Sequence, residues 1–212
     1  PPPPPPPPPP TPPPPPPPPP HILFRRQRQM CIRDSPMSRT SEGAEFIPLR
    51  IAVITISDSR SAENDTSGDF LSESLVSEGH ALASRKIVRD DKYVLRAELS
   101  ALIASDAVDV VLCTGSTGLT GRDVAPEAIE PLFDKSIEGF GELFRAASIE
   151  DIGAATIQSR AFAGVANGKI IFCMPGSPGA CRTAWESVIQ PQLDARTRPC
   201  NLANLMPRFL EQ

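Results

Sequence analysis

From residue 50 onward, short apolar stretches alternate with amphipathic ones, and this alternation limits what the chain can fold into. Apolar stretches at residues 51–56, 108–114 and 169–174 have the length of buried strands, and a further strand is expected to end at Val88. Alternating strands and helices are typical of an α/β domain built on a mostly parallel sheet. We therefore predict this fold class for the part of the chain after residue 49.

Four stretches between and after these strands have apolar residues at helical spacing. Gly79 is the expected end of the first helix, which begins near Thr66, and Ser177 followed by Pro178 is a favourable start for the last. Asn167-Gly168 predicts a tight turn before the last strand. The apolar positions of the helices are Leu71, Leu75, Leu95, Leu99, Leu102, Ile103, Phe140, Leu143, Phe144, Ala147, Cys181, Ala184, Trp185 and Val188. We expect these positions to face the core or a subunit interface.

Polar clusters follow the end of each predicted strand. They are Ser57-Asp58, Asp90-Asp91, the loop that begins at Gly115 and the loop that begins at Pro175. The carboxyl ends of parallel strands share one edge of a sheet, and open α/β sheets bind their ligands there. We expect the four clusters to converge on one cleft.

The loop at residues 115–123 reads GSTGLTGRD and follows an apolar strand. Glycines let backbone amides approach an anion, the hydroxyl groups add donors, and Arg122 and Asp123 supply a phosphate-pairing cation and a candidate metal ligand. The P-loop pattern does not fit, because five residues separate Gly115 from Gly121 and no lysine follows. The dinucleotide-binding pattern fails as well, because these glycines do not follow the first strand.

The first 36 residues differ in composition from the rest, because 19 of the 28 prolines lie within positions 1–20. We interpret residues 1–36 as a disordered, non-native segment with Met37 as the natural start, which mass spectrometry of protein from the natural source tests. Residues 37–49 form an expected N-terminal arm, residues 50–200 the domain, and residues 201–212 a tail.

Without the four arginines and one aspartate of the first segment, the chain carries a net charge of about −7. An acidic domain lacks the broad positive field of a nucleic-acid binder, and no stretch is long and apolar enough for a membrane span. The cysteines of the domain show no metal-ligand spacing, and two lie inside apolar strands, so we expect a cytoplasmic protein.

Zinc chemistry and triad hydrolysis are disfavoured, because His80 is the domain's one histidine and lies at the predicted start of a strand. Carboxylates, hydroxyl groups and backbone amides remain. This set suits magnesium-assisted phosphoryl or nucleotidyl transfer, in which a protein mainly positions reactants and stabilises charge.

Several long motifs also resemble a known family. They are GSTGLTGRDVAPEAI, EGFGELFR, SRAFAGVA and IFCMPGSPGACRTAWE. They resemble the molybdopterin-binding proteins of molybdenum cofactor biosynthesis, in the B-type branch related to molybdopterin adenylyltransferase, over about residues 45–200. The resemblance implies a three-layer fold with helices on both sheet faces, assembled as homotrimers or homohexamers. The implied reaction transfers AMP from Mg-ATP to the terminal phosphate of molybdopterin and releases pyrophosphate.

Carried onto this sequence, the resemblance implies that Asp90 and Asp123 are the functional acids, holding Mg²⁺ against ATP. Backbone amides of the glycine loop are the expected phosphate donors, and Arg122 pairs with pyrophosphate. Ser116 stands where the family commonly has glycine. If the loop needs a positive φ at this position, we expect Ser116 to be strained and nucleotide affinity to be lower. The residues expected to bind ligand are Ser57, Asp58, Gly115, Ser116, Thr117, Gly118, Arg122, Gly176 and Ser177.

Simpler interpretations of the same residues stay open. Asp123 is also explained as a residue that favours a helix N-terminus, and Asp90 and Asp91 as ordinary turn carboxylates. Asp91 is taken as a bystander, and Arg122 is also explained as a solvated charge. The alternative function is a non-catalytic carrier of molybdopterin or of the finished cofactor. ATP and GTP both remain candidates, and a molybdate insertase is a candidate recipient of the product.

Overall fold

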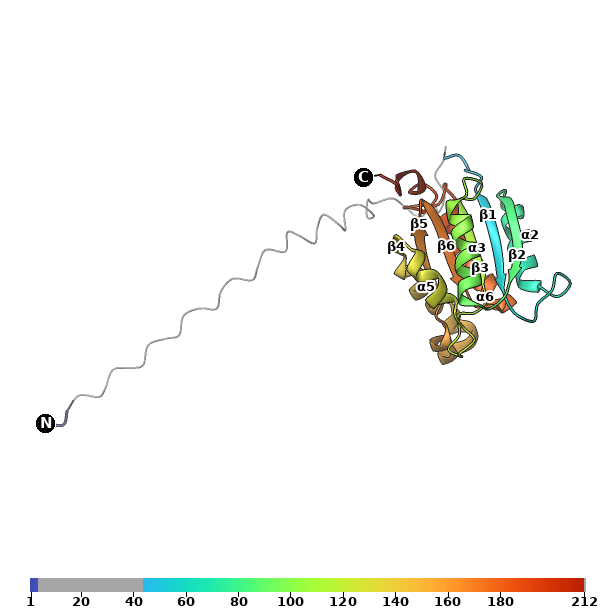
Figure 1. Cartoon of the computed structure of the whole chain (residues 1–212). Helices are drawn as coiled ribbons and strands as arrows, with labels where there is room; N and C mark the ends of the chain where they lie inside the picture. The colour runs from blue at the N-terminus through green and yellow to red at the C-terminus, as the bar shows by residue number, and fades with distance from the viewer. Residues whose placement is uncertain (4–43, 212) are drawn as a thin grey trace. The chain divides into compact units, whose positions relative to one another are not determined.

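A six-stranded sheet in the order β2-β1-β3-β6-β5-β4 forms the centre of the computed structural model, which describes residues 1–3 and 44–211 (Figure 1). The strands are β1 (Arg50–Ile56), β2 (Ala81–Val88), β3 (Val110–Thr114), β4 (Lys135–Ser136), β5 (Phe162–Ala166) and β6 (Lys169–Met174). The α-helices are α2 (Thr66–Ser77), α3 (Lys92–Ala104), α4 (Ala125–Ile129), α5 (Glu138–Ile152), α6 (Pro178–Ala184) and α7 (Gln190–Leu193).

Most of the sheet is parallel, which confirms the predicted fold class. Strand β1 pairs in parallel with β2 and β3, and β3 pairs in parallel with β6. The other two strands were not predicted: β5 runs antiparallel to β6, and β4 runs antiparallel to β5. The predicted turn at Asn167-Gly168 joins β5 to β6, and both of its residues have positive φ.

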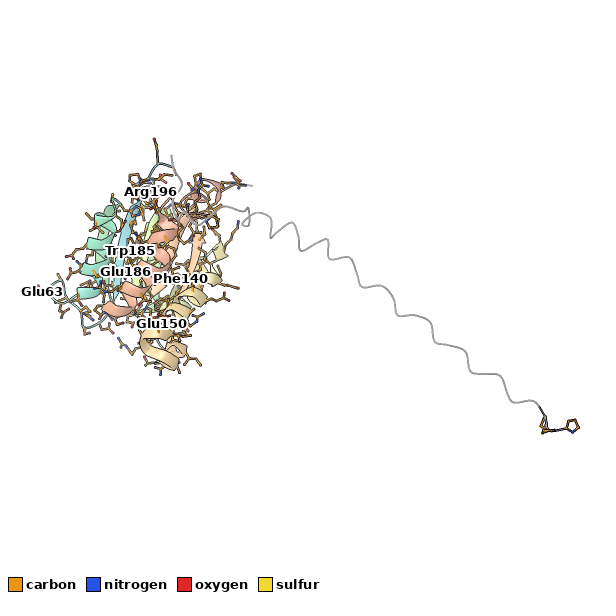
Figure 2. The ribbon with its side chains drawn as sticks, turned by 180° about the vertical axis from the view of Figure 1, so that it is seen from behind. Glu63, Phe140, Glu150, Trp185, Glu186 and Arg196 are labelled. Atoms are coloured by element: carbon orange, nitrogen blue, oxygen red, sulfur yellow. The ribbon has the colours of Figure 1, made fainter. Side chains whose placement is uncertain are left out.

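Helices cover both faces of the sheet, as alternation along β1 shows. Ile51 and Val53 belong to the core under α2, α5 and α6, whereas Ala52 and Ile54 belong to the core under α3 and α4. A central strand that is buried on both faces needs an uninterrupted apolar run, which is what the sequence has here. Figure 2, from behind, shows Phe140 and Trp185 among the helices of the first face.

Helix boundaries follow local capping chemistry. Asp65, Asp91 and Ser177 accept amide hydrogen bonds at the starts of α2, α3 and α6, and Pro178 occupies the first turn of α6. The last predicted helix is interrupted by a π-helical turn (Trp185–Ile189) before α7, whose first turn holds Pro191. Proline has no backbone N–H to donate, so regular bonding cannot continue through it.

Leu143 and His80 differ in their burial. Leu143 on α5 is 59% exposed, while its neighbours Phe140 and Phe144 are buried. His80 precedes β2 as expected and is buried, where its Nδ1 accepts a hydrogen bond from the amide of Leu49 at 3.2 Å. The position of His80 therefore belongs to the fold and not to the ligand cleft.

Several expectations concern residues 4–43 and 212, which lie outside the described residues. They include nearly all of the proline-rich segment and most of the arm at 37–49, so the proposed domain division stays a prediction. Within residues 1–3 and 44–211, every helix is too short or too polar to cross a bilayer.

Candidate functional site

The loops after the four parallel strands lie side by side at one edge of the sheet. The amide of Ser57, after β1, donates to Val88 O of β2, and the amide of Gly115, after β3, donates to Met174 O of β6, both at 2.9 Å. A Cβ at Gly176 would lie 3.2 Å from the Cα of Gly115. The sheet thus brings together the clusters that the sequence placed at strand ends.

The glycine loop begins with two residues in the left-handed region. Gly115 has φ of +108° and Ser116 has φ of 59°. A Cβ at Gly115 would lie 2.3 Å from Ile56 O, so only glycine fits there. The positive φ that would strain Ser116 is therefore present. Gly115 contributes this close approach and no phosphate donor, because its amide already donates to Met174 O.

Asp90 is tied to the glycine loop. Its Oδ1 accepts a hydrogen bond from Ser116 Oγ at 2.6 Å, and its amide donates to Asp58 Oδ1 at 3.3 Å. Burial raises the pKa of the Asp90 carboxyl, the Ser116 bond opposes the rise, and the charge of Asp123 adds to it. The net pKa of Asp90 lies above the ordinary value, and the charge of Asp123 is close enough to contribute to it.

Asp123 closes the other end of the same loop. Its Oδ2 accepts hydrogen bonds from Thr120 N at 2.8 Å and Thr120 Oγ1 at 2.6 Å. Burial raises the pKa of the Asp123 carboxyl, but the bonds from Thr120 and Gly118 and the charge of Arg160 outweigh it, so the net pKa is lowered. Carboxylates whose pKa values are moved in opposite directions are a common feature of functional sites.

Arg122, the cation of the glycine loop, pairs with Asp58, which follows β1. Arg122 Nη2 forms an ion pair with Asp58 Oδ2, and the Arg122 side chain is 71% exposed. Exposed ion pairs contribute little to stability, so Arg122 can exchange this partner for an anionic ligand at small cost. The Ser57 side chain stabilises its own loop, because its Oγ accepts hydrogen bonds from the amides of Ser59 and Arg60, each at 3.2 Å.

Arg160 is a contributor that the sequence analysis missed. Its Nε donates to Gly118 O at 2.7 Å, its Nη2 donates to Asp123 O at 2.8 Å, and Nη1 pairs with Glu127. Its amide donates to Thr117 O at 2.9 Å. The guanidinium fork thus holds the backbone of the glycine loop. Arg160 lies in a quoted motif, but its role depends on the unpredicted antiparallel strand β5.

Asp65 is a second residue whose role was not predicted from the sequence. Its side chain is fully buried and accepts hydrogen bonds from Arg85 Nη2 at 2.8 Å and Thr55 Oγ1 at 2.7 Å. Burial raises the pKa of the Asp65 carboxyl, but its bonds to Arg85, Thr55 and Gly68 outweigh burial and lower it. Next to it, Ser67 Oγ donates to Gly176 O at 2.9 Å, which joins α2 to the Pro175 loop.

A pocket of about 410 Å³ opens between the glycine loop, the Pro175 loop and the end of α5. Its walls combine the apolar Phe144, Ile152 and Ala180 with hydroxyl groups such as those of Thr117 and Thr156. Ser177 also lines it, although its Oγ accepts the amide of Ala180 at 3.2 Å and so caps α6. Apolar walls with a few polar groups are typical of small-molecule binding pockets.

The donor set of the cleft fits Mg²⁺ better than a tightly bound transition metal. Among residues 1–3 and 44–211, no three His, Cys, Asp or Glu side chains gather as metal ligands. Two carboxylates, however, is the usual protein contribution to a Mg²⁺ ion that also takes phosphate oxygens and water. Asp90 and Asp123 are the two carboxylates that would hold such an ion.

Comparison with known proteins agrees with this geometry. A family model described as a probable molybdopterin binding domain matches residues 52–195. The chain belongs to this family. Within the molybdopterin-binding family, it is 59% identical over 165 residues to molybdenum cofactor biosynthesis protein B of Escherichia coli K12, covering 78% of this chain and 96% of that protein. Family membership places the protein in molybdenum cofactor biosynthesis.

Solved structures of family members share the fold. A crystal structure of a molybdenum cofactor biosynthesis protein B matches with a TM-score of 0.71 and 42% identity, covering 78% of this chain and 98% of that one. The tungsten cofactor synthesizing protein MoaB from Pyrococcus furiosus matches with a TM-score of 0.63 and 40% identity, covering 69% and 92%. The three-layer α/β fold expected from the family resemblance is therefore confirmed.

Proposed function

We propose that the protein transfers AMP from Mg-ATP to the terminal phosphate of molybdopterin and releases pyrophosphate. The observation that carries the proposal is the meeting of Asp90 and Asp123 around one glycine loop, beside a pocket of suitable size for a pterin. In the reaction, a terminal phosphate oxygen of molybdopterin forms a bond to the α-phosphorus of ATP. The bond from that phosphorus to pyrophosphate breaks.

Asp90 and Asp123 would hold Mg²⁺, which when bound supplies charge compensation on the phosphate oxygens. The amides of Ser116 and Thr117 donate to no other atom of the described residues, so they are available to phosphate. Gly118 contributes less than expected, because its amide interacts with the carboxylate of Asp123. Arg122 is placed to exchange Asp58 for pyrophosphate.

The pterin would occupy the pocket beside the loop, with its ring between the walls formed by Phe144, Ile152 and Ala180. Thr117 lines this pocket as well as belonging to the loop, so one short segment touches both substrates. Binding both ends of the reaction on one rigid segment brings the reacting phosphates together, and this positioning is a large part of the rate enhancement in phosphoryl transfer.

The direct test is incubation of the protein with molybdopterin and Mg-ATP, followed by detection of adenylylated pterin and pyrophosphate. Formation of both products supports the proposal, and the same assay with Mg-GTP compares the two nucleotides. Pterin that stays bound without any adenylylated product contradicts it and supports the carrier function instead.

A further inference from the structure

The hydroxyl group of Ser116 lies at the centre of a small network. Ser116 Oγ accepts hydrogen bonds from the amides of Val124 at 2.7 Å and Ala125 at 3.0 Å. The same hydroxyl donates to Asp90 Oδ1 at 2.6 Å. Ser116 is 8% exposed, so water contributes little to satisfying these groups. One side chain therefore connects the glycine loop, the start of α4 and a candidate metal ligand.

The direction of the bond to Asp90 follows from the other two. Backbone amides can only donate, so the Ser116 oxygen must be the acceptor of both. Its single hydroxyl hydrogen is then left for a group that accepts, and Asp90 Oδ1 is that group. The Asp90 carboxylate is thereby held at one oxygen by a donor that is itself fixed by the backbone of residues 124–125.

The backbone conformation of Ser116 is unfavourable for a residue with a side chain. With φ of 59°, the residue is in the left-handed region, where a Cβ carries a steric cost and glycine carries none. Serine offsets that cost at this position with its three hydrogen bonds. Strain and hydroxyl contacts are therefore separate properties of Ser116, and two different substitutions can separate them.

We propose that Ser116 is a positioning residue that orients the Asp90 carboxylate for the metal it shares with Asp123. The proposal rests on the role given above to the two acids, and it gives the Ser116 hydroxyl a role beside the strain expected at this position. Partners of this kind, which orient a ligand without touching the ion, typically change metal affinity by about 10-fold or more.

The test measures binding of Mn²⁺ alone, by the electron paramagnetic resonance signal of the free ion, so it does not depend on catalysis. Ser116→Ala keeps the Cβ and removes the hydroxyl, and Ser116→Gly removes both and relieves the strained φ. We expect both variants to bind Mn²⁺ about 10-fold more weakly than the parent protein. Ser116→Gly should resist urea better than Ser116→Ala, so that stability and affinity separate.

Two further variants complete the design. Asp90→Asn removes the group through which Ser116 acts, so adding Ser116→Ala to it should cause no further loss of Mn²⁺ affinity. Ser72→Ala is the matched control, because Ser72 Oγ is buried without a hydrogen-bond partner among the described residues and lies on α2. It should bind Mn²⁺ as the parent protein does.

The outcomes separate the two proposals. If Asp90→Asn weakens Mn²⁺ binding and both Ser116 variants bind as the parent does, the positioning role is wrong while the acids keep their proposed task. Loss of affinity on Ser116→Ala that persists undiminished in the Asp90→Asn background also overturns the positioning role. If the parent protein binds no Mn²⁺, or binds it as well without Asp90, both proposals are overturned.

Discussion

The neighbours of single residues determine how the two acids of the candidate site titrate. Asp90 and Asp123 belong to one loop network, yet the pKa of Asp90 is raised and that of Asp123 is lowered. Burial raises the pKa of both carboxyl groups. At Asp90, which is the more buried, burial together with the charge of Asp123 outweighs the hydrogen bonds, whereas at Asp123 the bonds from Thr120 and Gly118 and the charge of Arg160 outweigh burial.

Asp123→Asn should reduce formation of adenylylated pterin by at least about 100-fold, because it removes a negative charge from the proposed metal site. The free energy of unfolding should change by less than about 1 kcal/mol, because little packing is lost. Asp91→Asn is the control: Asp91 caps α3, and asparagine is an equally good cap. Product assays and urea unfolding of both variants make the comparison. Parallel losses of activity and stability in Asp123→Asn would speak against a catalytic role.

Arg160→Lys should lower turnover by about 10-fold, because a lysine cannot contact Gly118 O and Asp123 O at the same time. Arg182→Lys is the control, since Arg182 lies on the surface in a pair with Glu186. Steady-state kinetics of both variants at saturating substrates test this. Unchanged turnover of Arg160→Lys would show that the glycine loop keeps its conformation without the guanidinium group of Arg160.

At the scale of elements, one buried ion pair joins α2 to the strands beneath it. Asp65 begins α2 and contacts Thr55 of β1 and Arg85 of β2, so two strands and a helix share it. Arg85 also pairs with Asp69 on the exposed side of α2, at 2.5 Å. Burial, and not the type of pair, distinguishes the two carboxylates.

Asp65→Ala should lower the free energy of unfolding by about 3–5 kcal/mol, because it leaves the Arg85 guanidinium partly buried with one carboxylate less. Asp69→Ala removes the other partner of the same arginine, and it should cost no more than about 1 kcal/mol because that carboxylate is exposed. Urea denaturation of both variants gives the comparison. Equal costs for the two substitutions would contradict this account.

The contact of His80 with the segment before β1 makes stability depend on pH. Burial lowers the pKa of His80 below its ordinary value of 6.5, so the unfolded chain binds the proton more readily. Stability from this group is complete above the ordinary pKa and falls as the pH drops from there toward the lowered pKa. The loss is at most about 1.4 kcal/mol per pH unit.

Urea unfolding at pH 7.5 and 5.5 measures this effect, with His80→Asn as the comparison. Asparagine keeps an acceptor for the amide of Leu49 but does not titrate in this range. The parent protein should therefore lose more stability between the two values than the variant does. Identical losses would assign the pH dependence to other groups.

At the scale of the whole molecule, the sequence predicted the parallel half of the sheet better than the rest. Strands β1, β3 and β6 have mostly apolar sequences because they are buried on both faces, and polar loops follow their ends. Strand β4 has two residues and β5 has a glycine in its centre, so neither has a periodicity to detect. The roles of Arg160 and of the Ser116 hydroxyl depend on contacts distant in the sequence, which local patterns do not contain.

The cysteines in the core should report on global unfolding. Cys113, Cys173 and Cys181 are at most 1% exposed, and burial raises the pKa of Cys173 and Cys181. Because the thiolate is the reactive form, alkylation of these three should follow the urea unfolding curve with the same midpoint. Peptide mapping after iodoacetamide treatment measures it. Rapid labelling in native buffer would indicate local opening of the sheet.

The reversed direction of β5 has a practical meaning for protein engineering. Its pairing of Phe162 with Cys173 brings the beginning of this strand to the edge where β1, β3 and β6 finish, and Arg160 arrives there with it. Arg160, which binds the backbone of the glycine loop, thus directly precedes a hairpin whose turn, Asn167-Gly168, lies at the other end of the strands. If the glycine loop alone were grafted onto another parallel sheet, it would lack the contacts from Arg160. A graft that keeps the conformation of the loop therefore has to include the hairpin as well.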